Sequence, residues 1–281
     1  MSINSQYLFI IYILLTTVCS KSIGQEDLYD IDHTKAFADF LYQTKQYDLA
    51  AREYERLQIL SPQKETPLRL FKSYRLAELY DIGLKRMDDL YDNIDSVSFH
   101  VYLERSRMQL RDNRFDHIYI ELPSLVNLTV ADKRIISGIA DVHQFNKSRT
   151  HLKVKEGHSS EYTKASFQNI EPILDDYYTE KWKKPWVAGS LSAIVPGTGR
   201  LYAGDWKNAI VSLVFVGLNG YQSYRGFSRN GITSPSGWIF GAIGFGFYIG
   251  NIYGSAWTAK RKNEQKKEEY QRRIDSIYFA P

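Results

Sequence analysis

Apolar residues recur at helical spacing along the first half of the chain. Between residues 28 and 145 they fall three or four positions apart, as at Phe37, Phe40 and Leu41, and glycine and proline are scarce. This period places one apolar stripe on each helix, which must pack against a neighbour to leave water. The pattern therefore predicts a run of about six amphipathic helices.

One stretch of this region has the layout of a known repeat. Large, small and proline positions follow one another over residues 31–64, at Phe37, Ala38, Leu41, Tyr47, Ala50, Tyr54, Leu57 and Pro62. The stretch resembles a tetratricopeptide repeat, in which small residues let two antiparallel helices approach and a proline ends the second helix. The next period matches less well, because Arg75 and Asp81 stand where apolar residues are expected. The resemblance implies a short α-solenoid over residues 25–145, and an ordinary helical bundle is the alternative.

The concave side of such a solenoid commonly holds a segment of another protein. Polar and aromatic residues on the inner helices are the candidates for a partner-binding groove: Tyr42, Lys45, Tyr74, Glu78 and Arg107. Each of them also fits an ordinary solvated helix surface. The resemblance thus predicts a protein partner without identifying it.

The N-terminal residues 7–18 form an apolar run. About a dozen residues suit the core of a signal peptide, whereas a membrane-spanning helix needs about 20. Small residues permit cleavage after Ser20 or after Gly24, and we expect a signal peptide over residues 1–24. An uncleaved anchor is the alternative, and lipidation at Cys19 is disfavoured by the neighbouring Val18.

Residues 146–184 are more polar and are expected to form a linker followed by a lead-in helix. Three histidines in and beside this stretch raise the question of a metal site: His143, His151 and His158. None of them forms an HExxH or similar close pair, and no acidic cluster accompanies them at ligand spacing. We expect solvated loop histidines and no bound metal.

Glycine and apolar residues dominate the second half. Of the 18 glycines, 14 lie between residues 185 and 257, and Asp205 is the one acidic residue in that stretch. The runs WVAGSLSAIV and NAIVSLVFVGLNGY and the twenty residues 238–257 are nearly free of charge. They predict a glycine-rich membrane domain over residues 185–257, a transmembrane helical hairpin or a three-helix module according to whether the first run crosses. A charged helical tail follows over residues 258–281.

Small and polar residues inside these runs indicate how the helices pack. Ala242, Gly246, Gly250 and Gly254 recur every fourth residue, which predicts a face that another helix approaches closely. The preceding helix of the same chain is the favoured partner, and a second copy is the alternative. Asn219 and Asn251 lie in otherwise apolar helices, where an unpaired amide is costly, so each should find a hydrogen-bond partner or line a polar path.

A turn motif joins the first two runs. Its residues fit P-G-x-G-x-x-Y-x-G, with Pro196, Gly197, Gly199, Arg200, Tyr202 and Gly204. A phosphate loop is excluded, because no Lys and Ser or Thr follow the second glycine. The motif resembles the membrane module of two-transmembrane TM2-like proteins and of an uncharacterised family of bacterial envelope proteins. This resemblance, over residues 183–262, implies a turn at the membrane interface with Arg200 and Tyr202 among the lipid headgroups.

Composition narrows the function further. The chain has 281 residues, 43% hydrophobic and 24% charged, and a net charge of +4, which excludes a wholly disordered chain and gives no nucleic-acid footprint. No catalytic residues, metal ligands or cofactor motif are found, so a non-enzymatic protein without a cofactor is expected. We expect an integral membrane protein of the bacterial envelope whose exported, periplasmic repeat domain binds a partner protein. The rivals are a homo-oligomeric membrane pore or remodelling element, and a hydrolase or glycan-binding domain within the helical half.

Overall fold

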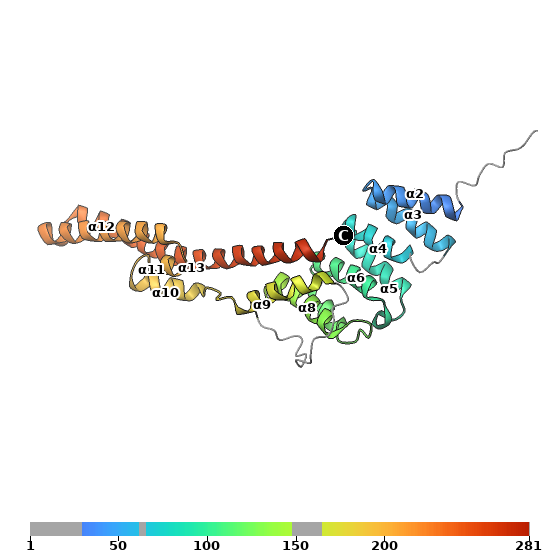
Figure 1. Cartoon of the computed structure of the whole chain (residues 1–281). Helices are drawn as coiled ribbons and strands as arrows, with labels where there is room; N and C mark the ends of the chain where they lie inside the picture. The colour runs from blue at the N-terminus through green and yellow to red at the C-terminus, as the bar shows by residue number, and fades with distance from the viewer. Residues whose placement is uncertain (1–29, 62–65, 148–164, 281) are drawn as a thin grey trace, which may run out of the picture. The chain divides into compact units, whose positions relative to one another are not determined.

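The computed structural model describes residues 30–61, 66–147 and 165–280. These residues form helices and connecting turns, with no strand among them, which confirms the all-α fold class (Figure 1). The expected signal peptide lies outside the described residues, as do His151 and His158. The chain divides into two compact units, Met1–Leu128 and Thr129–Pro281.

The first unit is a succession of short amphipathic helices, drawn from blue to green in Figure 1. Its helices are α2 (Ile31–Gln43), α3 (Tyr47–Leu60), α4 (Thr66–Leu76), α5 (Tyr80–Leu90), α6 (Phe99–Arg111) and α7 (Phe115–Glu121), with the short 3-10 helix η1 (Ile94–Ser96) before α6. Neighbouring helices pack in sequence order, and α4 also packs against α6. With α8 (Val130–Gln144), the described part of residues 28–145 contains seven α-helices, where the apolar period predicts about six.

The same tight turn occurs three times in this unit. Lys45, Glu78 and Asn113 each adopt a left-handed backbone conformation, with φ of 62°, 59° and 58°. In each case the N–H of the next residue donates to the carbonyl five residues back, as Gln46 does to Leu41 at 2.9 Å. The turns lie 33 and 35 residues apart. The unit therefore contains three equivalent helix pairs, α2–α3, α4–α5 and α6–α7.

The core of the first pair contains the small residues that the spacing indicates. Ala38 and Ala50 are fully buried, and Tyr54 and Leu57 are buried beside them. Small side chains on both helices let the two backbones approach closely, as the resemblance implies. Phe37 differs from the expectation, because its ring is 51% exposed.

The second unit begins one helix earlier than the sequence pattern indicates. Its elements are α8 (Val130–Gln144), η2 (Ala165–Asn169), α9 (Glu171–Thr179), α10 (Pro185–Ile194), α11 (Thr198–Tyr202), α12 (Trp206–Asn230), η3 (Gly231–Thr233) and α13 (Pro235–Tyr278). Thr129 and Asp132 form a capping box at the start of α8, and α8 packs against α9 and α13. The helix α8 thus belongs with the C-terminal half, although its apolar period is indistinguishable from that of the preceding helices.

The helix α13 joins two stretches that hydropathy separates. It is a single helix of 44 residues that contains both the apolar run and the charged tail. Its first part packs against α12 and α10, and its last part packs against α8, η2 and α9. There the ring of Tyr278 is fully buried and stacks on Phe167 at a centroid distance of 5.9 Å. The charged tail is therefore helical over residues 258–278, and one of its sides packs against the rest of the unit.

None of the described helices combines the length and the apolar character needed to cross a membrane. The helix α10 has only ten residues, and the apolar runs of α12 and α13 are diluted by glycines and by Asn208, Asn219 and Asn251. This finding contradicts the expected integral membrane protein of the bacterial envelope. Freedom from charge does not make these runs strongly apolar, because glycine, serine and tyrosine contribute little hydropathy.

Candidate functional site

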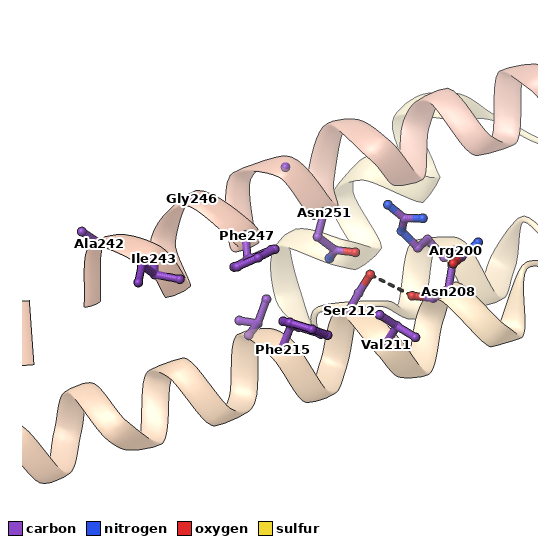
Figure 2. A pocket seen from close by; sticks show the side chains of 12 residues that line it. Arg200, Asn208, Val211, Ser212, Phe215, Ala242, Ile243, Gly246, Phe247 and Asn251 are labelled. Atoms are coloured by element: carbon purple, nitrogen blue, oxygen red, sulfur yellow. Dashed lines mark hydrogen bonds between the residues drawn. The ribbon is translucent and has the colours of Figure 1, made fainter. Parts of the chain in front are cut away.

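A cleft of about 710 Å³ opens between α12 and α13 in the second unit. Figure 2 shows side chains from both helices pointing into it, with Phe215 rising from α12 and Phe247 descending from α13. These two rings lie 5.3 Å apart between centroids and tilted by 43°. The cleft has an apolar end and a polar end, and it is lined by Arg200, Asn208, Val211, Ser212, Phe215, Val216, Ala242, Ile243, Gly246, Phe247, Gly250 and Asn251.

The predicted strip of small residues on α13 forms one wall of this cleft. An added Cβ at Gly246 or Gly250 would meet no atom within 4 Å, and Ala242 also lines the cleft. At Gly254 an added Cβ would lie 2.6 Å from Arg200 Nη2. Within the described chain the strip therefore faces open space and the Arg200 guanidinium, where the spacing predicts close contact with a helix.

The close contacts between α12 and α13 use other glycines. A Cβ at Gly226 would lie 2.7 Å from the backbone N of Gly237, and a Cβ at Gly244 would lie 3.2 Å from Cβ of Asn219. At Gly241 the nearest atom is Oγ of Ser223, at 2.9 Å. These glycines hold the hairpin together near its turn, and the two helices leave the cleft between them further along.

Asn219 and Asn251 have different surroundings. The Asn219 Nδ2 group donates to the carbonyl of Phe215, one turn earlier on its own helix, at 2.8 Å. Asn251 is only 4% exposed, and no described residue forms a hydrogen bond with its Nδ2 or its Oδ1. The expectation that each amide finds a partner holds for Asn219 and is wrong for Asn251, which points into the cleft (Figure 2).

The motif from Pro196 to Gly204 builds a tight connection between α10, α11 and α12. Gly197 precedes α11 with φ of 93°, and Gly204 has φ of 83°, conformations that glycine adopts most readily. A Cβ at Gly199 would lie 1.8 Å from the carbonyl oxygen of Ala188. Gly197 and Gly204 therefore permit a left-handed backbone, and Gly199 permits the close approach of α11 to α10.

Tyr202 and Arg200 of this motif contact the protein itself. The Tyr202 hydroxyl accepts the N–H of Lys184 at 3.1 Å, and the Lys183 ammonium lies 4.9 Å from the centre of its ring. The Asn263 side-chain amide also holds the Lys183 backbone: its Oδ1 accepts the Lys183 N–H, and its Nδ2 donates to the Lys183 carbonyl. Tyr202 thus fixes the start of α10, and Arg200 lines the cleft. Their expected position among lipid headgroups depended on the membrane prediction, which the structure contradicts.

The five predicted groove residues of the first unit lie in two kinds of place. Lys45 and Glu78 occupy the left-handed turns between paired helices, and they are exposed. Tyr74 is buried and its hydroxyl donates to Glu55 at 2.9 Å. Burial is the main cause of a raised pKa at the Tyr74 phenol, and the hydrogen bond to Glu55 is the second cause.

Tyr42 and Arg107 complete that set. Tyr42 is half-buried and packs edge-on against Tyr47 at 5.5 Å. Arg107 is buried and forms an ion pair with Glu104 at 2.6 Å. Arg107 and Tyr74 are thus inaccessible core residues. Their polar character suggested a groove, but it serves interactions between helices.

Two aromatic side chains that the helical period assigns to the core of the first unit lie on its surface. Phe37 and Phe40 on α2 are 51% and 55% exposed. In the second helix pair the positions equivalent to Phe40 and Phe37, counted from the repeated turn, are Ser73 and Leu70, and both are fully buried. The repeat period of 33 residues is the sequence signal for this difference, because it aligns Phe40 with the small polar residue Ser73.

No group of three or more His, Cys, Asp or Glu side chains within the described ranges could hold a metal ion. His143 ends α8 and is mostly buried, with its Nε2 3.0 Å from Asp275 Oδ1 on α13. It therefore links two helices, which corrects the expectation of a solvated loop histidine.

Comparison with protein-family models, with curated proteins and with solved structures finds no match to this chain.

Proposed function

We propose that the chain is a non-enzymatic protein-binding module, whose first unit is a tetratricopeptide-like stack of helix pairs that binds a helix of a partner protein. The observation that carries this proposal is the exposed face of α2 around Phe37 and Phe40. A single half-exposed apolar residue is common on protein surfaces. Phe37 and Phe40 differ from such residues because the equivalent positions in the later helix pairs are buried.

The third helix pair shows what covers this face when a neighbour is present. Met108, at the position of Phe40, is fully buried, and its Sδ would lie 2.7 Å from a Cβ at Gly83 on α5. Gly83 belongs to the preceding pair, so a helix of that pair covers the face. At Phe37 and Phe40 no described element covers the same face of the first pair, and one amphipathic helix would cover it as a helix of the preceding pair covers Met108.

Phe37 and Phe40 would act as the anchors of this contact. Aromatic residues at the centre of an interface commonly cost about 2 kcal/mol or more each on truncation. Costs at neighbouring anchors are not additive, so we expect the double replacement to cost about 2.8 kcal/mol in total, which weakens binding about 100-fold at 1.4 kcal/mol per tenfold change in Kd.

The test starts from affinity purification of the tagged full chain at native expression, followed by mass spectrometry. The recovered partner is then purified and its Kd is measured for the wild type and for Phe37→Asp/Phe40→Asp. The matched control is Ile59→Asp/Ile120→Asp, because both isoleucines are exposed apolar residues elsewhere in the same unit. Circular dichroism checks that both variants keep their helix content.

We expect the Phe37/Phe40 variant to lose binding about 100-fold and the control to bind as the wild type does. Equal binding by both variants would contradict the proposal. Recovery of the protein as a stable dimer that Phe37→Asp/Phe40→Asp dissociates would show that a second copy, and not another protein, occupies the face.

A further inference from the structure

The cleft between α12 and α13 is a feature that the partner-binding proposal does not use. It lies wholly within the second unit, and its volume of about 710 Å³ falls in the range of small-molecule sites. Gly246 and Gly250 leave one wall without side chains, so the space between the helices is not filled from within the chain. The lining residues show what kind of molecule fits.

One end of the cleft offers hydrogen-bonding groups without partners. Asn251 is buried on α13, and both atoms of its side-chain amide lack a hydrogen bond. Leaving such a group unpaired in a folded protein is costly, so native structures rarely retain one without a reason. Figure 2 shows this amide pointing between the helices, toward the side on which Arg200 lies.

The charge at this end is positive. Arg200 Nε is buried without a hydrogen-bond partner, and no described carboxylate forms an ion pair with the guanidinium. Asp205, the one acidic residue between positions 185 and 257, instead accepts the Asn208 Nδ2 group at 2.8 Å. The absence of a Cβ at Gly254 lets the Arg200 guanidinium lie against α13. A guanidinium and an amide together favour a carboxylate, which accepts hydrogen bonds from both.

The other end of the cleft is apolar. Phe215 and Val216 on α12 face Ile243 and Phe247 on α13, and no charged side chain lines this end. A ligand that satisfies both ends carries one anionic head and one hydrocarbon chain. We propose that the cleft binds a single-chain carboxylate amphiphile, such as a long-chain fatty acid, with its carboxylate at Arg200 and Asn251 and its chain between Phe215 and Phe247.

The experiment measures binding of dodecanoate to the purified full chain by isothermal titration calorimetry, with dodecanol as the uncharged probe of equal chain length. The wild type is expected to bind one dodecanoate, at least tenfold more tightly than dodecanol. In Arg200→Gln this preference disappears, because the charged donor is gone. The matched control is Arg229→Gln, which removes a positive charge from an exposed position of α12 outside the cleft.

Two glycine substitutions test the location. Gly246→Leu places a side chain in the cleft and should weaken dodecanoate binding at least tenfold, whereas Gly217→Leu, at a glycine with open space outside the cleft, should not. Gly254→Ala would put a methyl 2.6 Å from Arg200 Nη2, so it should reduce the preference for the carboxylate over the alcohol. Far-ultraviolet circular dichroism confirms that each variant is folded.

Three results would overturn the proposal. Equal affinity for dodecanoate and dodecanol in the wild type would show that no carboxylate site exists. Several molecules bound per chain, with no effect of Gly246→Leu, would show general adsorption to exposed apolar surface. A wild-type dimer that Gly246→Leu dissociates, with no dodecanoate bound, would show that a second copy fills the cleft. None of these results bears on Phe37 and Phe40, so the two proposals stand or fall separately.

Discussion

Replacing Gly199 with alanine tests the closest approach between two helices in the second unit. An added Cβ would lie 1.8 Å from the Ala188 carbonyl oxygen and 2.6 Å from Ser192 Oγ, whereas real Cβ contacts essentially never fall below 3.0 Å. The backbone of α10 or α11 must therefore shift by more than about 1 Å in a closely packed interior. The shift would also break the hydrogen bond that the Gly199 N–H donates to Ser192 Oγ at 2.9 Å.

The expected cost follows from three contributions. Overpacking costs about 1–3 kcal/mol, and contact with backbone places Gly199→Ala at the upper end of that range. Loss of the hydrogen bond adds about 1 kcal/mol, and the better helix propensity of alanine returns about 1 kcal/mol. The free energy of unfolding should thus fall by about 3 kcal/mol. Gly217→Ala is the matched control, because it lies within α12 with open space around it and should gain up to about 1 kcal/mol.

Urea unfolding followed by tryptophan fluorescence measures this difference. All five tryptophans lie between Trp182 and Trp257, so the signal reports on the second unit. The two variants should differ by about 4 kcal/mol, taken from their midpoints at equal slope. A difference below about 1 kcal/mol would refute the close approach of α11 to α10.

Two further predictions concern charged residues. Glu104 accepts hydrogen bonds from Arg75 and Arg107 at 2.6 Å each, so Glu104→Ala should cost about 3–5 kcal/mol in urea unfolding followed by circular dichroism; a cost under about 1 kcal/mol would contradict a buried network. The hydrogen bond with Lys266 lowers the pKa of Glu180, so the folded state gains stability from this pair at neutral pH and loses it as the pH falls through the lowered value. Lys266→Met should raise that pKa in an NMR titration, and an unchanged value would count against the pair.

The sequence predicts contacts within one helix pair better than contacts between pairs. Ala38 and Ala50 are identified by their spacing, because two helices joined by a short turn must pack on each other. Arg75 and Glu104 lie 29 residues apart, and no local pattern shows that they meet. A polar residue on an inner helix therefore does not by itself indicate a groove, since Arg107 neutralises a buried carboxylate.

In the second unit, the change from apolar to charged residues near Trp257 predicts a boundary between two segments. It is a change of surroundings along one continuous helix, since no proline or glycine follows Gly254 until Pro281 to end α13. Likewise, the four-residue spacing of Gly246 and Gly250 predicts a face without side chains, but it does not show whether a neighbour fills that face. The register of α12 against Gly237 and Gly244 decides this, and it leaves the cleft open.

The two exposed apolar regions owe their exposure to different physical causes. At Phe37 a face that is covered in later pairs has no neighbour among the described residues. At Gly246 the two helices are both present, and the absence of a side chain leaves the space between them unfilled beside the Asn251 amide, which no described residue hydrogen-bonds. The two proposals follow from this difference. We propose another helix for the surface of the first kind, because a helix covers the equivalent face elsewhere in the same unit, and a smaller molecule with one polar end for the space of the second kind, because its walls already come from the chain.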